Sequence, residues 1–273
     1  MKYQVLALDI DGTLLNSKSE LTPGTKAAVL RAKELGIRVI LATGRRLKNT
    51  LPLVHELGLQ GAVVVHNGAV IRDPNSDKIL FQQGIELVLA QDIVDKLNGR
   101  GLNYIVYTGE SAGERVVAPK GSWQEPEDLL GYYLGERVEF VENVTLVTPP
   151  IRISLIDETS RVDAFLDEYR GRYEESLTAL LFSTTRNVWR GIELLPRQCS
   201  KGAGLAFVVE KLGFDASQVI AIGDNVNDLE MIAWAGMGIA MDNGADQLKA
   251  MAKRIAPSND QDGVAQIIEE LLL

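Results

Sequence analysis

The chain has 273 residues, 46% of them hydrophobic, and a formal net charge of −9. This length allows one large domain or two smaller ones, and the hydrophobic fraction argues against a disordered protein. The negative charge argues against a nucleic-acid surface, which needs a basic patch, and against docking on anionic lipid by charge alone.

The first part of the chain alternates apolar strands with helices. Three continuous apolar runs predict strands at residues 5–8, 37–42 and 62–65. A helix between the first two begins with a cap at Thr22 and a proline at Pro23, and it ends at Gly36. A second helix with one apolar face follows and ends at Gly58. Continuous apolar strands separated by helices are typical of a parallel sheet that is covered on both faces.

The pattern changes between about residue 84 and residue 190. Strands are predicted there at 103–108, 151–156 and 177–182, and helices at 86–97 and 161–169. The strands of this segment alternate polar and apolar residues, which suits a sheet with one solvated face. We therefore predict an inserted α+β domain over residues 84–190.

After residue 191 the first pattern returns. Apolar strands are predicted at 219–222 and 238–241, and helices at 201–213, at 227–236 and at the end of the chain. The predicted fold class is therefore α/β. Residues 1–83 and 191–273 would form a Rossmann-like parallel sheet with helices on both faces, interrupted by the inserted domain.

The N-terminus and the cysteine content predict a cytoplasmic protein. No apolar run approaches the roughly 20 residues that a membrane-spanning helix needs. The first residues, MKYQVLALDIDG, lack the cleavage site of a signal peptide. The single cysteine, Cys199, excludes an internal disulfide and fits a reducing compartment. Only His55 and His66 are available to activate it as a nucleophile, so we interpret Cys199 as a thiol beside a helix start.

Polar residues follow four predicted core strands at the point where each strand ends. They are Asp9, Asp11 and Gly12 after the first strand, Thr43, Gly44 and Arg45 after the second, Asn67 after the third, and Asp224, Asn227 and Asp228 after a later one. Lys201 stands at the start of a late helix. Because ligands of an open parallel sheet bind outside the carboxyl ends of its strands, these side chains can converge.

The two aspartates after the first strand are the least easily explained as structural. Asp9 and Asp11 can be a cap or a turn pair, but Asp9 directly follows four apolar residues. Burying an unpaired carboxylate there is costly, so we favour a functional role. Asp224 and Asp228 can cap a helix, but one cap needs one residue, and this stretch also contains two asparagines.

For Thr43, Asn67 and Lys201, a purely structural role explains the sequence about as well as a functional one. Thr43 can be a helix cap, and the pair Asn67-Gly68 is a strong hairpin-turn signal. Lys201 can be a surface residue. However, a cation at a helix N-terminus opposes the helix dipole, which indicates that a nearby group needs it.

Four carboxylates (Asp9, Asp11, Asp224 and Asp228) and one lysine are thus predicted to converge. Like charges this close raise one another's pKa unless a cation neutralises them. Oxygen ligands without a His/Cys cluster indicate a hard divalent ion, and Mg²⁺ suits a site that leaves positions for water and phosphate. Lys201, the Thr43 hydroxyl and backbone N–H groups suit a phosphate. Together they indicate phosphoryl transfer through an aspartyl-phosphate.

The chain resembles the haloacid dehalogenase superfamily of phosphatases, and specifically its Cof-like branch with a class IIB cap. Four motifs carry the resemblance over nearly the whole length: DIDGTLL at Asp9, LATGR at Thr43, SKG at Lys201 and GDNVNDLEM at Asp224. One departure is the stretch AMDNGAD, where the family often has a Gly-Asn-Ala-like turn, and we assign no ligand role to Asp242.

The resemblance implies a role for each site residue. Asp9 would be the nucleophile, and Asp11 the general acid and then the base. Mg²⁺ would bind Asp9, Asp224 and the Asp11 carbonyl, and Asp228 would support either the metal or Lys201. Thr43 and Lys201 would hold the phosphoryl oxygens, and Asn227 would contact the phosphate or the water shell of the metal. Gly12 would let backbone N–H groups face the phosphate. Gly44, Arg45 and Asn67 would lie near the substrate.

The resemblance also implies a phosphatase of small metabolites with a cap at the insertion. A phosphotransferase or phosphomutase on the same scaffold is the nearest alternative, and a non-catalytic phosphate-binding regulatory module is another. Such a module is expected to lack Asp9, Asp11 or Lys201, and all three are present. The natural substrate and the oligomeric state are not predicted. Five residues of the insertion could line a leaving-group pocket, with nothing to select among them: Tyr104, Tyr107, Trp123, Arg186 and Trp189.

Overall fold

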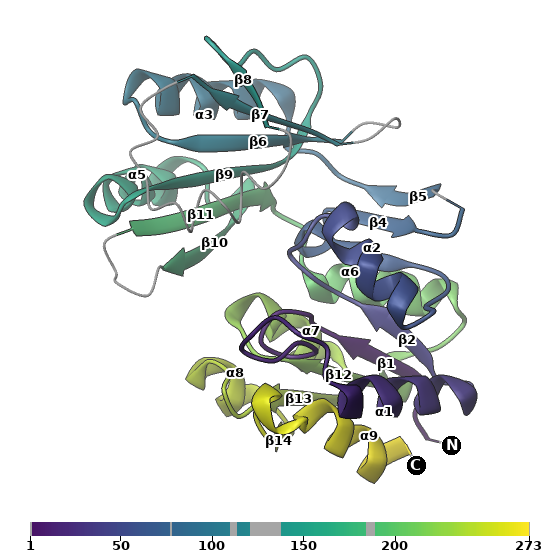
Figure 1. Cartoon of the computed structure of the whole chain (residues 1–273). Helices are drawn as coiled ribbons and strands as arrows, with labels where there is room; N and C mark the ends of the chain where they lie inside the picture. Colours follow the sequence, from purple (N-terminus) through teal and green to yellow (C-terminus); the bar gives the residue numbers. More distant parts are fainter. Residues whose placement is uncertain (1, 77, 110–113, 121–137, 184–188, 273) are drawn as a thin grey trace. The chain divides into compact units, whose positions relative to one another are not determined.

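A computed structural model describes residues 2–76, 78–109, 114–120, 138–183 and 189–272 (Figure 1). Contacts divide the chain into two compact units. The core unit comprises Met1–Phe81 and Cys199–Leu273, and the inserted unit comprises Gln82–Gln198. The predicted insertion, residues 84–190, lies within the second unit, which is longer because its last strand continues to Pro196.

The core unit is built on a five-stranded sheet with the order β14-β13-β12-β1-β2. Its strands are β1 (Val5–Leu8), β2 (Arg38–Leu41), β12 (Val219–Gly223), β13 (Met237–Met241) and β14 (Arg254–Ala256). Every neighbouring pair is parallel, and β1 lies between β2 and β12. The predicted α/β class with a parallel sheet is confirmed.

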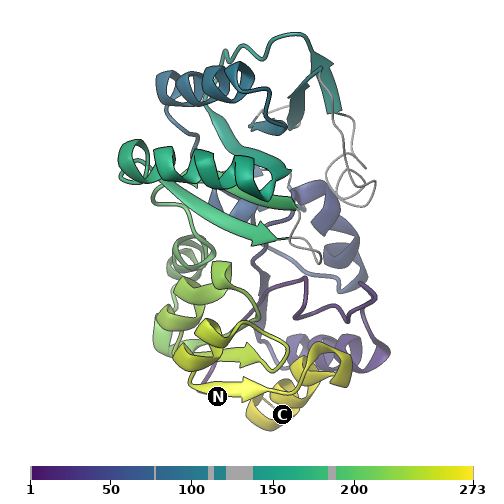
Figure 2. The same ribbon diagram turned by 90° about the vertical axis from the view of Figure 1, so that its left-hand side faces the viewer.

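Helices cover both faces of this sheet (Figure 1). The helices of the core unit are α1 (Pro23–Glu34), α2 (Leu47–Glu56), α6 (Lys201–Lys211), α7 (Leu229–Trp234), α8 (Asp246–Met251) and α9 (Gly263–Leu272). Figures 1 and 2 show α1 and α9 side by side, whereas α6 packs on α7. Alternate strand residues such as Val5 and Ala7 pack against Leu205 and Met231 of the α6 and α7 layer. This burial on both faces explains the continuous apolar runs.

The third predicted strand joins the sheet only marginally. β3 (Val63–Val65) is linked to the end of β2 by a parallel bridge between Ala42 and Val64. It forms a second, three-stranded sheet with β4 (Val70–Asp73) and β5 (Lys78–Gln82). A short turn joins the antiparallel pair β3 and β4, with Asn67 at φ +51° and Gly68 at φ +92°. The Asn67-Gly68 signal therefore marks a hairpin turn.

The inserted unit is a mixed sheet with the strand order β10-β11-β9-β6-β7-β8. Its strands are β6 (Tyr104–Thr108), β7 (Arg115–Pro119), β8 (Val138–Val141), β9 (Pro150–Glu158), β10 (Leu177–Ser183) and β11 (Trp189–Pro196). β7 and β8 are parallel, and the other neighbouring pairs are antiparallel. Helices α3 (Leu87–Gly99) and α5 (Thr159–Arg172) share an apolar core with the sheet. The predicted α+β insertion is confirmed.

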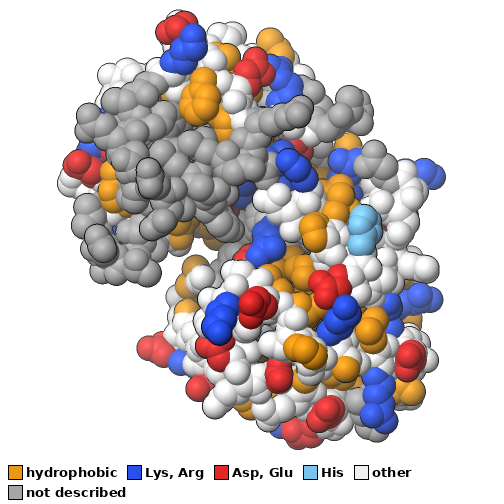
Figure 3. Space-filling model, viewed as in Figure 1, with side chains coloured by type: hydrophobic (Ala, Val, Ile, Leu, Met, Phe, Trp, Pro, Cys, Tyr) orange, Lys and Arg blue, Asp and Glu red, His pale blue; other side chains and the backbone are white. Residues whose placement is uncertain are grey.

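On the face of the core unit that Figure 3 shows, acidic and basic side chains are interspersed and no continuous basic patch is visible among the described residues. In the part of the chain that the structure describes, no helix combines the length and the apolar character needed to cross a membrane.

Candidate active site

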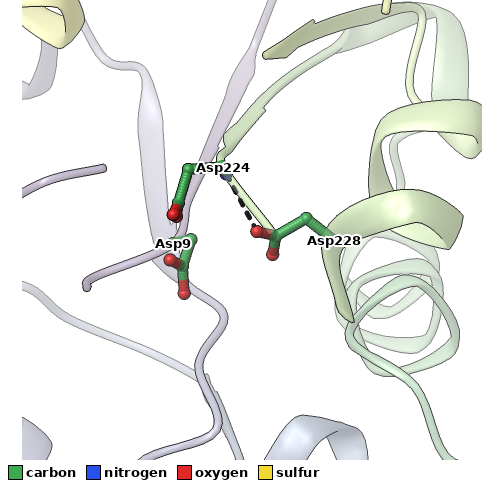
Figure 4. A group of neighbouring side chains, drawn as sticks. All are labelled: Asp9, Asp224 and Asp228. Atoms are coloured by element: carbon green, nitrogen blue, oxygen red, sulfur yellow. Dashed lines mark hydrogen bonds between the residues drawn. The ribbon is translucent and has the colours of Figure 1, made fainter. Parts of the chain in front are cut away.

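The carboxyl ends of β1 and β12 and the start of α6 bring four charged side chains together. Asp9 directly follows β1, and Asp224 follows β12. Asp228 ends the short 3-10 turn Val226–Asp228, and Lys201 is the first residue of α6. Figure 4 shows the three carboxylates from these separate segments facing one another.

Lys201 lies between two of the carboxylates. Its Nζ donates to Asp9 Oδ1 at 2.6 Å and to Asp228 Oδ1 at 2.7 Å. The side chains of Lys201, Asp9 and Asp228 are 1%, 5% and 0% exposed. Burial lowers the pKa of the lysine ammonium, but Asp228 and Asp9 outweigh this effect and hold its pKa above the ordinary value. Two buried carboxylates thus explain a cation at a helix N-terminus.

Asp228 also shapes the loop that carries Asp224. Its Oδ2 accepts the backbone N–H groups of Asp224 and Asn225, each at 3.0 Å. A Cβ atom at Gly223 would lie 2.5 Å from Asp228 Cγ, so only glycine permits this close approach. Both oxygens of Asp228 are therefore engaged within the protein, which fits support of Lys201 and of the Asp224 loop.

The pKa values of the other two carboxyl groups reflect burial and mutual repulsion. Burial raises the pKa of Asp9 well above its ordinary value, Lys201 opposes the shift, and Asp228 and Asp224 add to it. Burial and Asp228 raise the pKa of Asp224 to about 6. Thr13 Oγ1 donates to Asp224 Oδ1 at 3.0 Å and so orients this carboxylate.

The donor set fits a hard divalent cation. Asp9, Asp224 and Asp228 each offer a carboxylate oxygen, and the three oxygens lie within 4.8 Å of one another. Lys201 neutralises only one of three negative charges when all are ionised. Because like charges in a buried site repel, a bound cation would stabilise the ionised cluster. Oxygen ligands of this kind suit Mg²⁺ or a similar ion.

The Asp11 side chain does not join this cluster, which corrects the prediction that four carboxylates converge. Gly12, at φ +80°, turns the chain after β1, and the side chain of Asp11 is 46% exposed. Arg45 binds both of its oxygens, Nε to Oδ2 at 2.7 Å and Nη2 to Oδ1 at 2.5 Å. Simple strand alternation, which would point Asp9 and Asp11 the same way, is broken by the turn. Arg45 thereby holds Asp11 at the rim of the site.

Thr43, Gly44 and Asn67 are brought together around the end of β2. The Thr43 hydroxyl is buried and accepts the backbone N–H of Arg45 at 3.1 Å. The backbone N–H of Asn67 donates to the Thr43 carbonyl at 2.9 Å, and a Cβ atom at Gly44 would lie 3.1 Å from the Asn67 amide. Asn227 Nδ2 donates to Asn67 Oδ1 at 2.9 Å. The hairpin turn at Asn67 therefore contacts both the loop after β2 and the loop after β12.

Two residues of the site were not predicted. Thr13 lies within the first motif but was not singled out, although a hydroxyl two residues after Asp11 is a possible signal. Asn243 donates from Nδ2 to the Gly12 carbonyl at 2.8 Å. It was noted only as part of a turn. For the inserted unit, Trp123 and Arg186 lie outside the described residues, and Tyr104 is buried with its hydroxyl bonded to Asn98.

Cys199 is buried, and burial raises the pKa of its thiol to about 12. A thiol with so high a pKa is a poor nucleophile. This agrees with its interpretation as a structural residue beside the start of α6.

Comparisons with known proteins give a consistent result. The model of the haloacid dehalogenase-like hydrolase family matches residues 6–268. The 5-amino-6-(5-phospho-D-ribitylamino)uracil phosphatase YcsE of Bacillus subtilis is 30% identical, over 99% of this chain and 96% of its own length. Pyridoxal phosphate phosphatase YbhA of Escherichia coli is 26% identical over the whole of both chains. A crystal structure of a haloacid dehalogenase-like hydrolase from Bacteroides thetaiotaomicron, 27% identical, superposes with a TM-score of 0.84 over 99% of this chain and 100% of that one.

Proposed function

The chain belongs to the haloacid dehalogenase-like hydrolases, in the Cof-like branch of phosphatases, and on this premise we propose a specific reaction. The protein hydrolyses phosphomonoesters of small metabolites with Mg²⁺, through an aspartyl-phosphate on Asp9. The observation that supports this most is the buried ammonium of Lys201 between Asp9 and Asp228, with Asp224 within ligand distance.

In the first step a carboxylate oxygen of Asp9 attacks phosphorus, and the bond between phosphorus and the leaving oxygen breaks. Lys201 uses two of its three N–H groups on Asp9 and Asp228, so the third can bind a phosphoryl oxygen. The Thr43 hydroxyl, at the end of the adjacent strand, can donate to another. Asp11 gives a proton to the leaving oxygen and becomes a carboxylate, which requires that one of its oxygens first release Arg45 and carry that proton.

In the second step Asp11 takes a proton from a water molecule, whose oxygen attacks phosphorus and releases Asp9. Phosphate leaves, and both aspartates return to their starting states. Arg45 orients Asp11 through two hydrogen bonds while leaving it partly exposed at the rim. Mg²⁺, held by Asp9, Asp224 and the Asp11 carbonyl with support from Asp228, would neutralise the negative charge of the carboxylates and the phosphoryl group.

We assign the chemistry to the core unit. Among the described residues, the acid cluster that can hold a metal lies in the core unit alone. The relatives named above act on two different phosphorylated metabolites, so a small phosphorylated metabolite is the substrate class proposed here. The single cysteine fits a cytoplasmic location.

The test is phosphate release from p-nitrophenyl phosphate and a panel of phosphomonoesters that includes sugar phosphates, pyridoxal phosphate and 5-amino-6-(5-phospho-D-ribitylamino)uracil. Each is measured with Mg²⁺, with EDTA and with the Asp9→Asn variant. We expect release that needs Mg²⁺ and is lost in the variant. Release equal to that of Asp9→Asn across the whole panel would contradict the proposal. Phosphoryl transfer that appears only with an added sugar acceptor would favour the phosphotransferase alternative.

A further inference from the structure

The loop that follows β1 is held from outside by two asparagines of the C-terminal part of the chain. Asn243, in the turn after β13, donates from Nδ2 to the Gly12 carbonyl at 2.8 Å. Asn259, before α9, donates from Nδ2 to the Leu15 carbonyl at 2.8 Å. The backbone N–H of Asn259 also donates to Asn243 Oδ1 at 3.0 Å, which joins the two residues. Asn243 and Asn259 are together called the asparagine bracket below.

Within the asparagine bracket, the position of Asn243 needs a primary amide side chain. Asn243 donates from its nitrogen to Gly12 and accepts with its oxygen from Asn259. An aspartate can accept but not donate when ionised, and alanine can do neither. Asn243 lies at the surface, where folding alone places little demand on the residue type, whereas Asn259 is buried.

The turn that carries Asn243 also touches the loop of Asp224. The backbone N–H of Ala245 donates to the Asp224 carbonyl at 2.8 Å. A Cβ atom at Gly244 would lie 2.7 Å from the same carbonyl oxygen, so the turn approaches as closely as a glycine allows. One short segment therefore contacts both the loop after β1 and the loop after β12.

The Gly12–Thr13 peptide lies between the asparagine bracket and the carboxylate of Asp224. A Cβ atom at Gly12 would lie 2.4 Å from Asp224 Oδ2, and Thr13 Oγ1 donates to Asp224 Oδ1 at 3.0 Å. The loop's own bonds are few: the N–H of Leu15 reaches the Ile10 carbonyl at 3.0 Å, and that of Thr13 reaches it at 3.4 Å. Because glycine rotates easily, a bond to the Gly12 carbonyl is the direct means of fixing this peptide.

We propose that Asn243, braced by Asn259, is a positioning residue that sets the spacing between the Gly12 loop and Asp224. Through this spacing it controls how tightly the Asp9–Asp224 cluster binds a divalent cation and how Asp11 is aligned. The effect on turnover rests on the proposed phosphatase function, whereas the effect on cation binding does not.

The test compares Asn243→Ala with Asp242→Ala, its neighbour in the same turn, whose exposed side chain makes no hydrogen bond or ion pair with the described residues. Asn259→Ala serves as a second variant. Isothermal titration calorimetry gives the Mg²⁺ dissociation constant of the full chain, steady-state assays give kcat and KM, and circular dichroism checks folding at the assay temperature. The value of one exposed hydrogen bond predicts Mg²⁺ binding weakened about three- to tenfold in Asn243→Ala.

We expect the kcat of Asn243→Ala to fall by a similar factor, while its KM changes less than about twofold. In Asn259→Ala the Mg²⁺ affinity and kcat should change in the same direction. Asp242→Ala should match the wild type in both quantities. Mg²⁺ affinity and kcat of Asn243→Ala within twofold of the Asp242→Ala values would overturn the proposal. Unfolding of both asparagine variants would also overturn it, in favour of a purely structural role. If the wild type releases no phosphate, the proposed function fails, and the Mg²⁺ titrations still decide the role of Asn243.

Discussion

In the inserted unit a buried charge meets one partner of opposite sign, whereas the core unit gathers three carboxylates around one ammonium. The buried carboxylate of Asp157 binds Arg161 through both of its oxygens and also accepts the N–H groups of Asn103 and Glu158. Arg152 pairs with Glu193 at 3.0 Å, and both side chains are largely buried. In the core unit Lys201 pairs with both Asp9 and Asp228, and a carboxylate oxygen of Asp224 lies within 4.8 Å of an oxygen of each.

This difference separates two uses of buried charge. A balanced pair such as Asp157–Arg161 satisfies its own hydrogen bonds and fixes the fold locally. An unbalanced cluster costs stability unless a ligand of opposite charge binds, so it is retained where a ligand is needed. The comparison therefore supports our proposal that the chemistry takes place in the core unit.

The largest expected effect comes from removing the single cation of the core cluster. Lys201→Met leaves Asp9 and Asp228 buried without their partner, and breaking a buried pair in this way costs about 3–5 kcal/mol. Loss of the phosphoryl contact should also lower kcat about 1000-fold. Urea unfolding and phosphate release measure the two effects.

The matched variant in the inserted unit is Arg161→Met, which removes the partner of Asp157. We expect it to lose stability as well, by about 1–3 kcal/mol because Arg161 is partly exposed, while kcat stays within about twofold. The proposed difference between the two units would be contradicted if Lys201→Met kept more than a tenth of the wild-type kcat. It would also be contradicted if Arg161→Met lost as much activity as Lys201→Met.

A second prediction concerns the contact between the hairpin turn and the start of α6. A Cβ atom at Gly68 would lie 2.0 Å from the Ser200 carbonyl oxygen, next to Lys201. Gly68→Ala must therefore displace the helix start, and we expect a loss of about 2–4 kcal/mol and a kcat lowered about 100-fold.

Gly61→Ala is the control for this variant. Gly61 has nearly the same φ, +89° against +92°, but nothing lies within 4 Å of its added Cβ atom. It should lose only about 1 kcal/mol from backbone strain and keep its activity. Equal kcat values for the two alanine variants would show that the steric contact at Gly68 does not position Lys201.

A third prediction uses the cation directly. A cation that binds the folded cluster and not the unfolded chain stabilises the fold, so at about 100 times its Kd the proposed Mg²⁺ should stabilise the wild type by about 2.7 kcal/mol. Thermal unfolding with and without Mg²⁺ measures this, with Asp224→Asn as the variant that should lose the shift. A shift of the same size in Asp224→Asn would place the cation elsewhere.

The smallest expected effect concerns the hydroxyl that orients Asp224. Thr13→Val removes the bond to Asp224 Oδ1 and should weaken Mg²⁺ binding about fivefold, the value of one hydrogen bond. Tyr104→Phe removes a comparable bond to Asn98 in the inserted unit, and it should cost about 1 kcal/mol of stability without changing Mg²⁺ binding. Unchanged affinity in Thr13→Val would argue that Asp224 is oriented by its backbone alone.

The sequence predicted the parts of this arrangement that depend on local patterns. Continuous apolar strands placed Asp9 and Asp224 at one edge of a parallel sheet, and the helix start placed Lys201 beside them. Strand alternation alone did not predict the direction of the Asp11 side chain, because β1 ends at Leu8 and the chain turns at Gly12, directly after Asp11.

Other features depend on side-chain contacts between distant segments. Asn243 lies 231 positions from the carbonyl that it holds, and no periodicity or cap signal marks such a bond. Similarly, the apolar run that predicted β3 carries no information on its partner, and β3 pairs mainly with β4 rather than with β2.

The most direct test of the central claim, that Asp9 in the core cluster carries the phosphoryl group, is an acid-quench experiment. The protein is mixed with Mg²⁺ and a ³²P-labelled phosphomonoester that it hydrolyses, quenched within milliseconds, and digested for peptide mapping. We predict a hydroxylamine-sensitive label on the peptide that contains Asp9, absent from Asp9→Asn. Rapid phosphate release with no label on this peptide at any quench time, or a label on another residue, would contradict the account.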